Sequence, residues 1–330
     1  VSRDALTHHL AVPKLYIQHG GIYEIPELFF SYYPMNLDLL YILPLYFGND
    51  ILPKFIHYAF ALLTAGMIYG YLKKRLDTLY AWAGAFIFLT VPVILKLSIT
   101  VYVDLGLVFF ITAALVYLFK WIEDGLRFRH LAVSAVFCGL GLGTKYNGLV
   151  ALFILVLFIA YAFIHTDQSV NNNRKQAKAF GYAAAYFIIA ALVFSPWMVR
   201  NVLWKGNPVY PLYNSVFNST PVKTIAPADA ALDAQIKERT GGWSHLAIRR
   251  ILYKESWTQL ALIPLRMFFE GQDNDPKYFD GKLNPFFLLL PIFAFFYTRS
   301  ASPTIRLEMR VLLLFSILFV LISFLRTSIR

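Results

Sequence analysis

Residues 148–165 read GLVALFILVLFIAYAFIH, an apolar stretch that contains no Asp, Glu, Lys or Arg. A helix needs about 20 apolar residues to cross the hydrocarbon core of a bilayer, and this stretch approaches that length. Its apolar residues are continuous and do not alternate with polar ones, which favours a helix over a barrel strand. Inside lipid, a helix also satisfies its own backbone hydrogen bonds. The stretch therefore predicts a membrane-spanning helix.

The composition of the whole chain extends this interpretation. Of the 330 residues, 58% are hydrophobic and 15% are charged, and the mean hydropathy is +0.56, a balance foreign to water-soluble domains of this size. We expect an all-α integral membrane protein folded as a bundle of several spans. Eight apolar stretches qualify, two of them short: 53–72, 78–97, 101–120, 131–144, 148–165, 179–199, 284–298 and 310–327.

The positive charges lie in short clusters between the predicted spans. The formal net charge of +11 would by itself allow a nucleic-acid partner. Clusters between spans instead orient a membrane protein with its basic loops in the cytoplasm, so we expect no nucleic-acid partner. The segments 1–35 and 200–283 then face outward. Four clusters carry this argument: Lys73, Lys74 and Arg75; Lys120, Arg127 and Arg129; Arg174, Lys175 and Lys178; Arg299, Arg306 and Arg310.

Four regions follow from this topology. Residues 1–52 form a first outer loop, in which the apolar piece 35–47 is too short to span and predicts an interfacial helix. Residues 53–199 form a six-span membrane core, and residues 200–283 form a second outer loop. Residues 284–330 hold two further spans. Because the chain starts in polar sequence at its first residue, we expect an upstream first span. We also expect a continuation beyond the last residue.

Three charged residues mark the predicted outer ends of the spans. Asp104 opens a long apolar helix, where a carboxylate costs a few kcal/mol unless it is paired, so it either caps the helix or belongs to a site. Lys145 lies in a turn between two spans, and Arg200 follows Pro196 and Trp197. A lone cation there would reach for lipid headgroups. Several cations beside carboxylates instead favour a site for a lipid-linked phosphate.

The first outer segment carries further candidates. Asp4 is either a surface carboxylate or a general base that activates an acceptor hydroxyl. His8 and His9 are adjacent, so on a helix they point about 100° apart and would not jointly bind a metal. One of them could hold a divalent metal with Glu24 or Asp104, although a site without metal is favoured. The single cysteine, Cys138, excludes a disulfide framework and a cysteine-based metal site.

The glycine-rich run 139–145 does not have the order of a nucleotide-binding phosphate loop and follows a predicted membrane helix. Its small residues instead predict close packing between helices.

Several segments, in this order, resemble the GT-C superfamily of multi-span glycosyltransferases, specifically bacterial proteins similar to family 39 protein mannosyltransferases and to the lipid A aminoarabinose transferase. Each segment is weak alone, and the ordered set is moderately specific. The segments are Asp4-Ala5-Leu6-Thr7-His8-His9-Leu10, Pro13-Lys14-Leu15-Tyr16, Tyr33-Pro34-Met35, Tyr102-Val103-Asp104, Gly143-Thr144-Lys145-Tyr146, Pro196-Trp197-Met198-Val199-Arg200-Asn201, Gly206-Asn207-Pro208-Val209-Tyr210-Pro211 and Phe279-Asp280-Gly281.

The resemblance implies a GT-C-like bundle in a bacterial inner membrane, with interfacial helices in its outer loops and a polyprenyl-phosphate-sugar donor. It implies inverting transfer to a protein, lipid or glycan acceptor on the outer side. Asp4 matches the family's first-loop aspartate, which acts as base or positions the acceptor, and Asp104 matches a second acidic position. The cations that match the donor phosphate site are Lys145, Arg200 and Arg330.

This sequence also departs from the family pattern. Ala5 follows Asp4 where the family often has Asp-Glu, and Tyr33-Pro34-Met35 replaces His-Pro-Pro, which leaves metal dependence and acceptor class open. Two other hypotheses for the function stay open as well. A secondary transporter or lipid-linked-sugar flippase would favour ionisable residues near mid-membrane and an inverted repeat. The second hypothesis is a non-catalytic partner in polysaccharide assembly.

Overall fold

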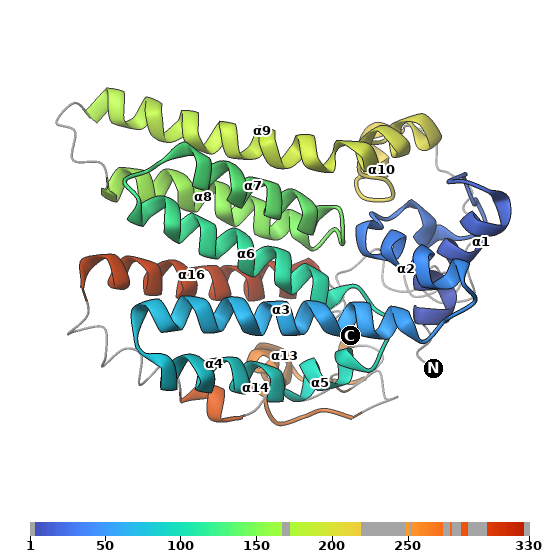
Figure 1. Cartoon of the computed structure of the whole chain (residues 1–330), viewed down its shortest axis with the longest axis horizontal. Helices are drawn as coiled ribbons and strands as arrows, with labels where there is room; N and C mark the ends of the chain where they lie inside the picture. Colours follow the sequence, from blue (N-terminus) through green and yellow to red (C-terminus); the bar gives the residue numbers. More distant parts are fainter. Residues whose placement is uncertain are drawn as a thin grey trace. The chain divides into compact units, whose positions relative to one another are not determined.

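The computed structural model describes residues 4–166, 172–218, 249–250, 253–272, 278, 285–289 and 302–326. Within these ranges the regular elements are helical and no β-strand forms (Figure 1), which confirms the all-α prediction. The chain divides into two compact units. The first comprises Val1–Leu89 and Leu97–Ile225, and the second comprises Thr90–Lys96 and Ala226–Arg330.

The first unit is built on helices that are long and apolar. Four of them could each cross a membrane by length and composition: α3 (Leu52–Arg75), α6 (Asp104–Glu123), α8 (Gly148–Thr166) and α9 (Asn172–Lys205). The helix α7 (Phe128–Leu142) is apolar but shorter. In Figure 1, α3, α6, α7, α8 and α9 run side by side.

One further predicted span is broken. The helices α4 (Thr78–Thr90) and α5 (Pro92–Ser98) are long enough to cross a membrane only when they are taken together. Pro92 explains the break, because proline has no backbone N–H and its ring disfavours a helical residue before it. The structure thus places helices in all six predicted ranges between residues 53 and 199.

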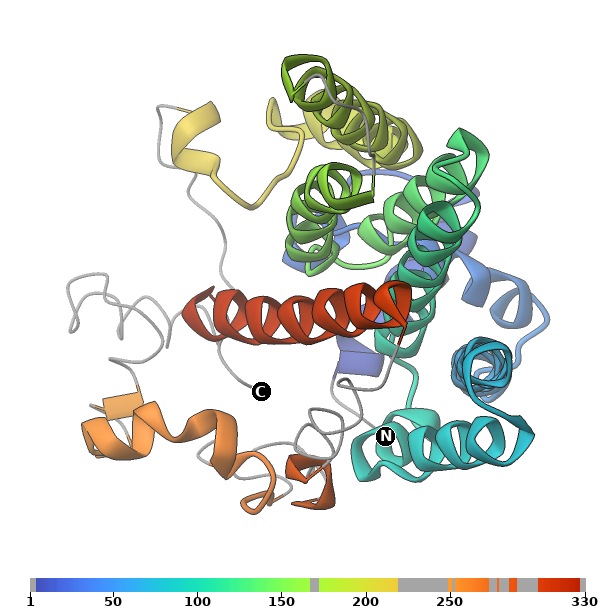
Figure 2. The same cartoon turned by 90° about the vertical axis from the view of Figure 1, so that its left-hand side faces the viewer.

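The helix α6 is the most enclosed element of the first unit. It packs against α3 and α7, while α9 packs against α7 and α8, and Figure 2 shows α3 nearly end-on beside α6. Trp121, Leu118 and Phe119 of α6 are fully buried. At Gly139 on α7, an added Cβ would lie 2.7 Å from the carbonyl oxygen of Ala190 on α9. The glycine-rich run therefore permits close helix packing, as predicted.

Several short elements gather at the end of the first unit where α6 begins. They are η1 (Ala5–His9), α1 (Ala11–His19), η2 (Phe29–Tyr32), α2 (Asn36–Tyr46) and α10 (Asn214–Phe217). The helix α2 occupies the range predicted for an interfacial helix, and its position in a membrane stays a prediction. The helix α1 was not predicted; Gly20 ends it with φ 82°.

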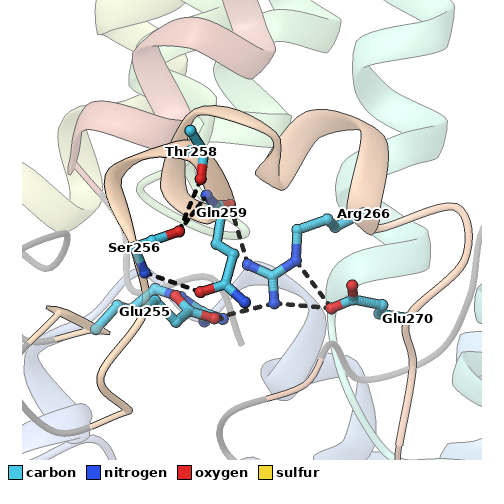
Figure 3. Close-up of polar contacts among 7 residues, drawn as sticks. Glu255, Ser256, Thr258, Gln259, Arg266 and Glu270 are labelled. Atoms are coloured by element: carbon cyan, nitrogen blue, oxygen red, sulfur yellow. Dashed lines mark hydrogen bonds and ion pairs between the residues drawn. The ribbon is translucent and has the colours of Figure 1, made fainter.

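The second unit contains α13 (Trp257–Ala261), α14 (Ile263–Arg266), η3 (Pro285–Leu288) and α16 (Pro303–Arg326). A capping box between Ser256 and Gln259 starts α13. Figure 3 shows Arg266 between Glu255 and Glu270, at 3.0 and 2.7 Å. Arg249 also binds Glu255, so this buried carboxylate holds α13 and α14 to the segment before them.

Some predictions in this region cannot be compared with the structure. The segment Phe279-Asp280-Gly281, Arg330 and most of the 284–298 span lie outside the described residues.

Candidate active site

An ion pair marks the start of α6. Lys145 Nζ donates to Asp104 Oδ1 at 2.7 Å, and the two side chains are 38% and 31% exposed. The residue that precedes the helix is Val103, and no side chain caps this end. The sequence-based alternative in which Asp104 caps the helix by a side-chain hydrogen bond is therefore wrong, because its carboxylate turns to Lys145. In the first turn it still complements the positive end of the helix.

A buried histidine, His57, accepts a backbone hydrogen bond at this helix end. The backbone N–H of Leu105 donates to His57 Nε2 at 3.0 Å. His57 Nδ1 lies 3.1 Å from the carbonyl oxygens of Leu97 and Thr100. The imidazole is therefore neutral with its proton on Nδ1, because one nitrogen has to accept and the other has to donate. His57 ties α3 to the entry of α6 and so positions Asp104.

His8 and His9 have different partners, although their rings lie close together, with centroids 4.1 Å apart. His9 Nδ1 lies 2.7 Å from Oδ1 of Asp38, and both side chains are buried. The His8 ring stacks on Phe30 at a centroid distance of 4.6 Å. Burial, with smaller contributions from the charges of His9 and Lys145, lowers the pKa of His8 to about 3. His8 is thus neutral near pH 7.

Arg200 is clamped by backbone and aromatic groups. Its Nη2 donates to the carbonyl oxygens of Tyr32 at 2.6 Å and Tyr33 at 3.0 Å. Its guanidinium also contacts the rings of Trp197 and Trp204, at 4.6 and 4.9 Å from their centroids. Its Nη1 is buried and has no hydrogen-bond partner among the described residues. One donor of a fixed cation is therefore left unsatisfied.

The hydroxyl of Tyr16 is unsatisfied in the same way. Tyr16 is 2% exposed, and its oxygen has no hydrogen-bond partner in the described part of the chain. It lies close enough to Arg200 for the guanidinium to act on its ionisation. A hydrogen bond between the two groups contributes to this effect, so the Tyr16 hydroxyl and the Arg200 guanidinium face each other, although their geometry is not that of a good hydrogen bond. A further polar or anionic group beside them would complete their hydrogen bonding.

Two asparagines join the turn that carries Lys145 to the helix that carries Arg200. Asn201 Nδ2 donates to the hydroxyl of Tyr146 at 3.1 Å. Asn36 Oδ1 accepts from Trp197 Nε1 at 2.7 Å, and its backbone N–H donates to the carbonyl oxygen of Gly143 at 2.8 Å. The two cations predicted for the donor phosphate are therefore held on one hydrogen-bonded frame.

Glu24 belongs to a neighbouring pair. Lys205 Nζ lies 2.7 Å from Glu24 Oε1, and the Tyr32 hydroxyl donates to the same oxygen at 2.7 Å. Although desolvation opposes the shift, the bonds from Lys205 and Tyr32 lower the pKa of Glu24. Asp104 is likewise paired with a lysine. No group of three or more His, Cys, Asp or Glu able to hold a metal occurs among the described residues.

The comparison with protein families finds one match, within the helical bundle. Residues 47–199 match the model of the dolichyl-phosphate-mannose-protein mannosyltransferase family. The chain carries a glycosyltransferase domain of this family. The resemblance to GT-C membrane glycosyltransferases is thereby confirmed, as are a lipid-phosphate-sugar donor and an integral membrane protein with several apolar spans. No curated protein and no solved structure matches the chain.

The glycosyltransferase domain covers only part of the candidate site. Asp104 and Lys145 lie inside the matched residues, whereas Arg200 lies directly after them. The candidates of the first outer segment, Asp4, His8, His9 and Glu24, precede the match. Arg330, the third predicted phosphate ligand, lies outside the described residues.

Asp4 lies in a segment that packs near the start of α6. It immediately precedes η1, and Ala5 packs in a small core with Val101 and Val103, next to the start of α6. No described side chain pairs with the Asp4 carboxylate. The segment that carries Asp4 is thus anchored beside Asp104.

Four residues of this site were missed in the sequence. Asp38 and His57 are single polar residues within apolar helices, and that isolation is a signal for a buried functional or structural group. Tyr16 and Asn36 carried no such signal, because tyrosine and asparagine are common in surface segments.

Proposed function

We propose that this glycosyltransferase moves a sugar from a polyprenyl-phosphate donor to an acceptor on the outer side of the membrane, with inversion at the anomeric carbon. The name of the matching family makes mannose the first candidate sugar and a protein the first candidate acceptor. The observation that carries the proposal is the frame that joins Lys145, paired with Asp104, to Arg200.

Lys145 and Arg200 would stabilise the negative charge that builds up on the departing phosphate, which is usually a large catalytic contribution. Arg200 Nη1 and the Tyr16 hydroxyl, which face each other, support this role, because neither has a hydrogen bond of good geometry and a phosphate oxygen would accept one from each. Asp104 would keep Lys145 in place and offset part of its charge, so that the bound phosphate is not held too tightly for release.

Asp4 would receive or position the acceptor hydroxyl. Inversion requires the acceptor and the leaving phosphate on opposite faces of the sugar, so Asp4 and the two cations would flank one cavity. His8 and His9 would border the acceptor, with His8 uncharged.

The outward orientation rests on the opposite end of the bundle. Lys73, Lys74 and Arg75 end α3, and Lys120 lies in the last turn of α6. Basic residues at these ends favour the cytoplasmic side, so the candidate site would face the outer side of a bacterial inner membrane. The four regions 1–52, 53–199, 200–283 and 284–330 are part of the same proposal.

The test is Asp4→Asn, assayed in membranes with a radiolabelled lipid-phosphate sugar. We expect a loss of about 100-fold or more, as for removal of a general base, while the amount of protein is unchanged. Glu27→Gln is the matched control, because Glu27 is an exposed carboxylate of the same segment. Near-normal transfer by Asp4→Asn would contradict the assignment. Movement of the lipid-linked sugar across vesicles without product would favour a flippase.

A further inference from the structure

A cavity of about 330 Å³ lies between the last turns of α3 and α6, in the first unit and at the end opposite to the candidate active site. Its apolar walls are Met67, Gly70, Tyr71 and Val116. An added Cβ at Gly70 would meet no atom within 4 Å. The glycine therefore leaves open a space that any larger side chain would occupy.

The mouth of the cavity is positively charged. Lys74, Arg75 and Lys120 line it together with one carboxylate, Glu123. Glu123 contacts Lys74 at 2.7 Å and Arg75 at 2.8 Å. Lys120 lies over the ring of Tyr117 at 4.6 Å, and no described carboxylate pairs with it. Three cations against one carboxylate leave an excess of positive charge beside an apolar space.

Cations at the ends of two helices also complement the helix dipoles, and lysines at span ends commonly extend to the membrane surface. Neither effect accounts for the open cavity or for a third cation that converges on it. An apolar cavity with a cationic mouth, at the level where spans leave the membrane, matches the chemistry of a lipid with a negatively charged headgroup.

We propose that this cavity binds an anionic phospholipid. The phosphodiester would lie between the ammonium groups of Lys74 and Lys120, and the first part of an acyl chain would lie against Met67, Gly70 and Val116. A phospholipid is favoured over the polyprenyl-phosphate donor because Lys120, at the mouth of the cavity, lies 16 residues after Asp104 on α6, which is a separation of about 24 Å.

The experiment measures binding of a fluorescent phosphatidylglycerol to the purified full chain in detergent. Unlabelled phosphatidylglycerol, phosphatidylcholine and undecaprenyl phosphate are the three competitors. We expect phosphatidylglycerol to compete best and phosphatidylcholine to compete poorly. The double variant Lys74→Gln and Lys120→Gln should weaken binding about 25-fold, or about fivefold for each lysine.

The matched control is Lys175→Gln with Lys178→Gln, which removes the same charge from an exposed part of α9. It should bind phosphatidylglycerol as the unmodified chain does. Gly70→Leu should block binding without a change in charge, and retention of sugar transfer by this variant would show that it folds.

Equal competition by phosphatidylcholine would overturn the proposal, as would equal loss in the control. A clear preference for undecaprenyl phosphate would also overturn it and assign the cavity to the substrate lipid. None of these outcomes bears on Asp4, so the proposed function is tested separately.

Discussion

The two ends of α6 hold their charges in different ways. At the end that begins with Asp104, the contacts come from distant parts of the chain: Lys145 from the turn after α7, and His57 from α3. At the end that carries Glu123, the partners are Lys74 and Arg75, which are adjacent residues of one helix. The first arrangement fixes several elements together, whereas the second joins two helix ends.

Burial separates the two ends further. Asp38 and His57, which lie near the Asp104 pair, are 2% and 0% exposed. At the other end the Lys74 side chain is 60% exposed, although Arg75 and Glu123 are only 10% and 20% exposed. A buried polar group that loses its partner carries its full desolvation cost, whereas an exposed one returns to water. Substitutions should therefore alter activity and folding strongly at the first end and weakly at the second.

The largest effect is expected for Lys145→Met. It would remove a cation from the departing phosphate and leave Asp104 unpaired, and loss of such stabilisation typically lowers the rate about 100- to 1,000-fold. The measurement is sugar transfer in membranes at matched protein levels. Lys74→Met, an equivalent change at the other end of α6, should keep transfer within about twofold of the original rate. Equal losses in both variants would show that the two ends do not differ in function.

The next effect is expected for Asp38→Asn. It replaces the carboxyl group that faces His9 Nδ1 at 2.7 Å in a buried place, and it should lower the free energy of unfolding by about 1–3 kcal/mol. Thermal unfolding in detergent measures the change. Asp50→Asn is the control, because Asp50 is exposed. An unchanged unfolding temperature in Asp38→Asn would mean that the pair does not stabilise this end.

At the Asp104 end of α6, the sequence predicted the features that depend on local pattern. The apolar stretches gave the helices of the first unit, and the carboxylate at the start of an apolar helix singled out Asp104. Lys145 was predicted because it lies at the predicted outer ends of the spans, on the same side as Asp104 and Arg200. These predictions needed only the local pattern and the order of the spans along the chain.

The partners could not be predicted in the same way. Asp104 turned to Lys145 and not to its own helix end because the turn after α7 packs beside it, and that is a tertiary contact. Arg200 was expected to face a phosphate, yet one of its nitrogens is bound to the backbone of η2. The helix α1 was missed because Pro13 and scattered polar residues obscure its pattern, while its packing on α2 stabilises it.

A smaller effect tests the buried character of the first end by pH. The pKa of His8 is about 3 in the folded chain, below the ordinary value of about 6.5. The unfolded chain therefore binds a proton first as the pH falls below about 6.5, and stability decreases down to about pH 3. Between pH 7.5 and 5 we expect the chain to lose on the order of 1–2 kcal/mol more than His8→Phe does.

The comparison with His8→Phe isolates the effect of protonating His8 on stability. His9, Lys145 and Asp104 act on His8, but they are present in both proteins, so their own titration largely cancels in the difference. Phenylalanine keeps a ring against Phe30. Parallel loss of stability in the two proteins over this pH range would show that His8 titrates normally and that this end is more open to water than the structure indicates.

The smallest effect is expected at the opposite end, for Glu123→Gln. Glu123 contacts two cations at the surface end of two helices, Lys74, which is 60% exposed, and Arg75, which is 10% exposed. The exposed pair contributes about 0–1 kcal/mol, and the amide of glutamine can still accept a hydrogen bond from Arg75. The unfolding temperature should fall only slightly, and added salt should shrink the difference between Glu123→Gln and the original chain, because salt screens exposed pairs. Sugar transfer should be unchanged. A loss of stability as large as that of Asp38→Asn, unaffected by salt, would mean that the Glu123 end is as tightly enclosed as the Asp104 end.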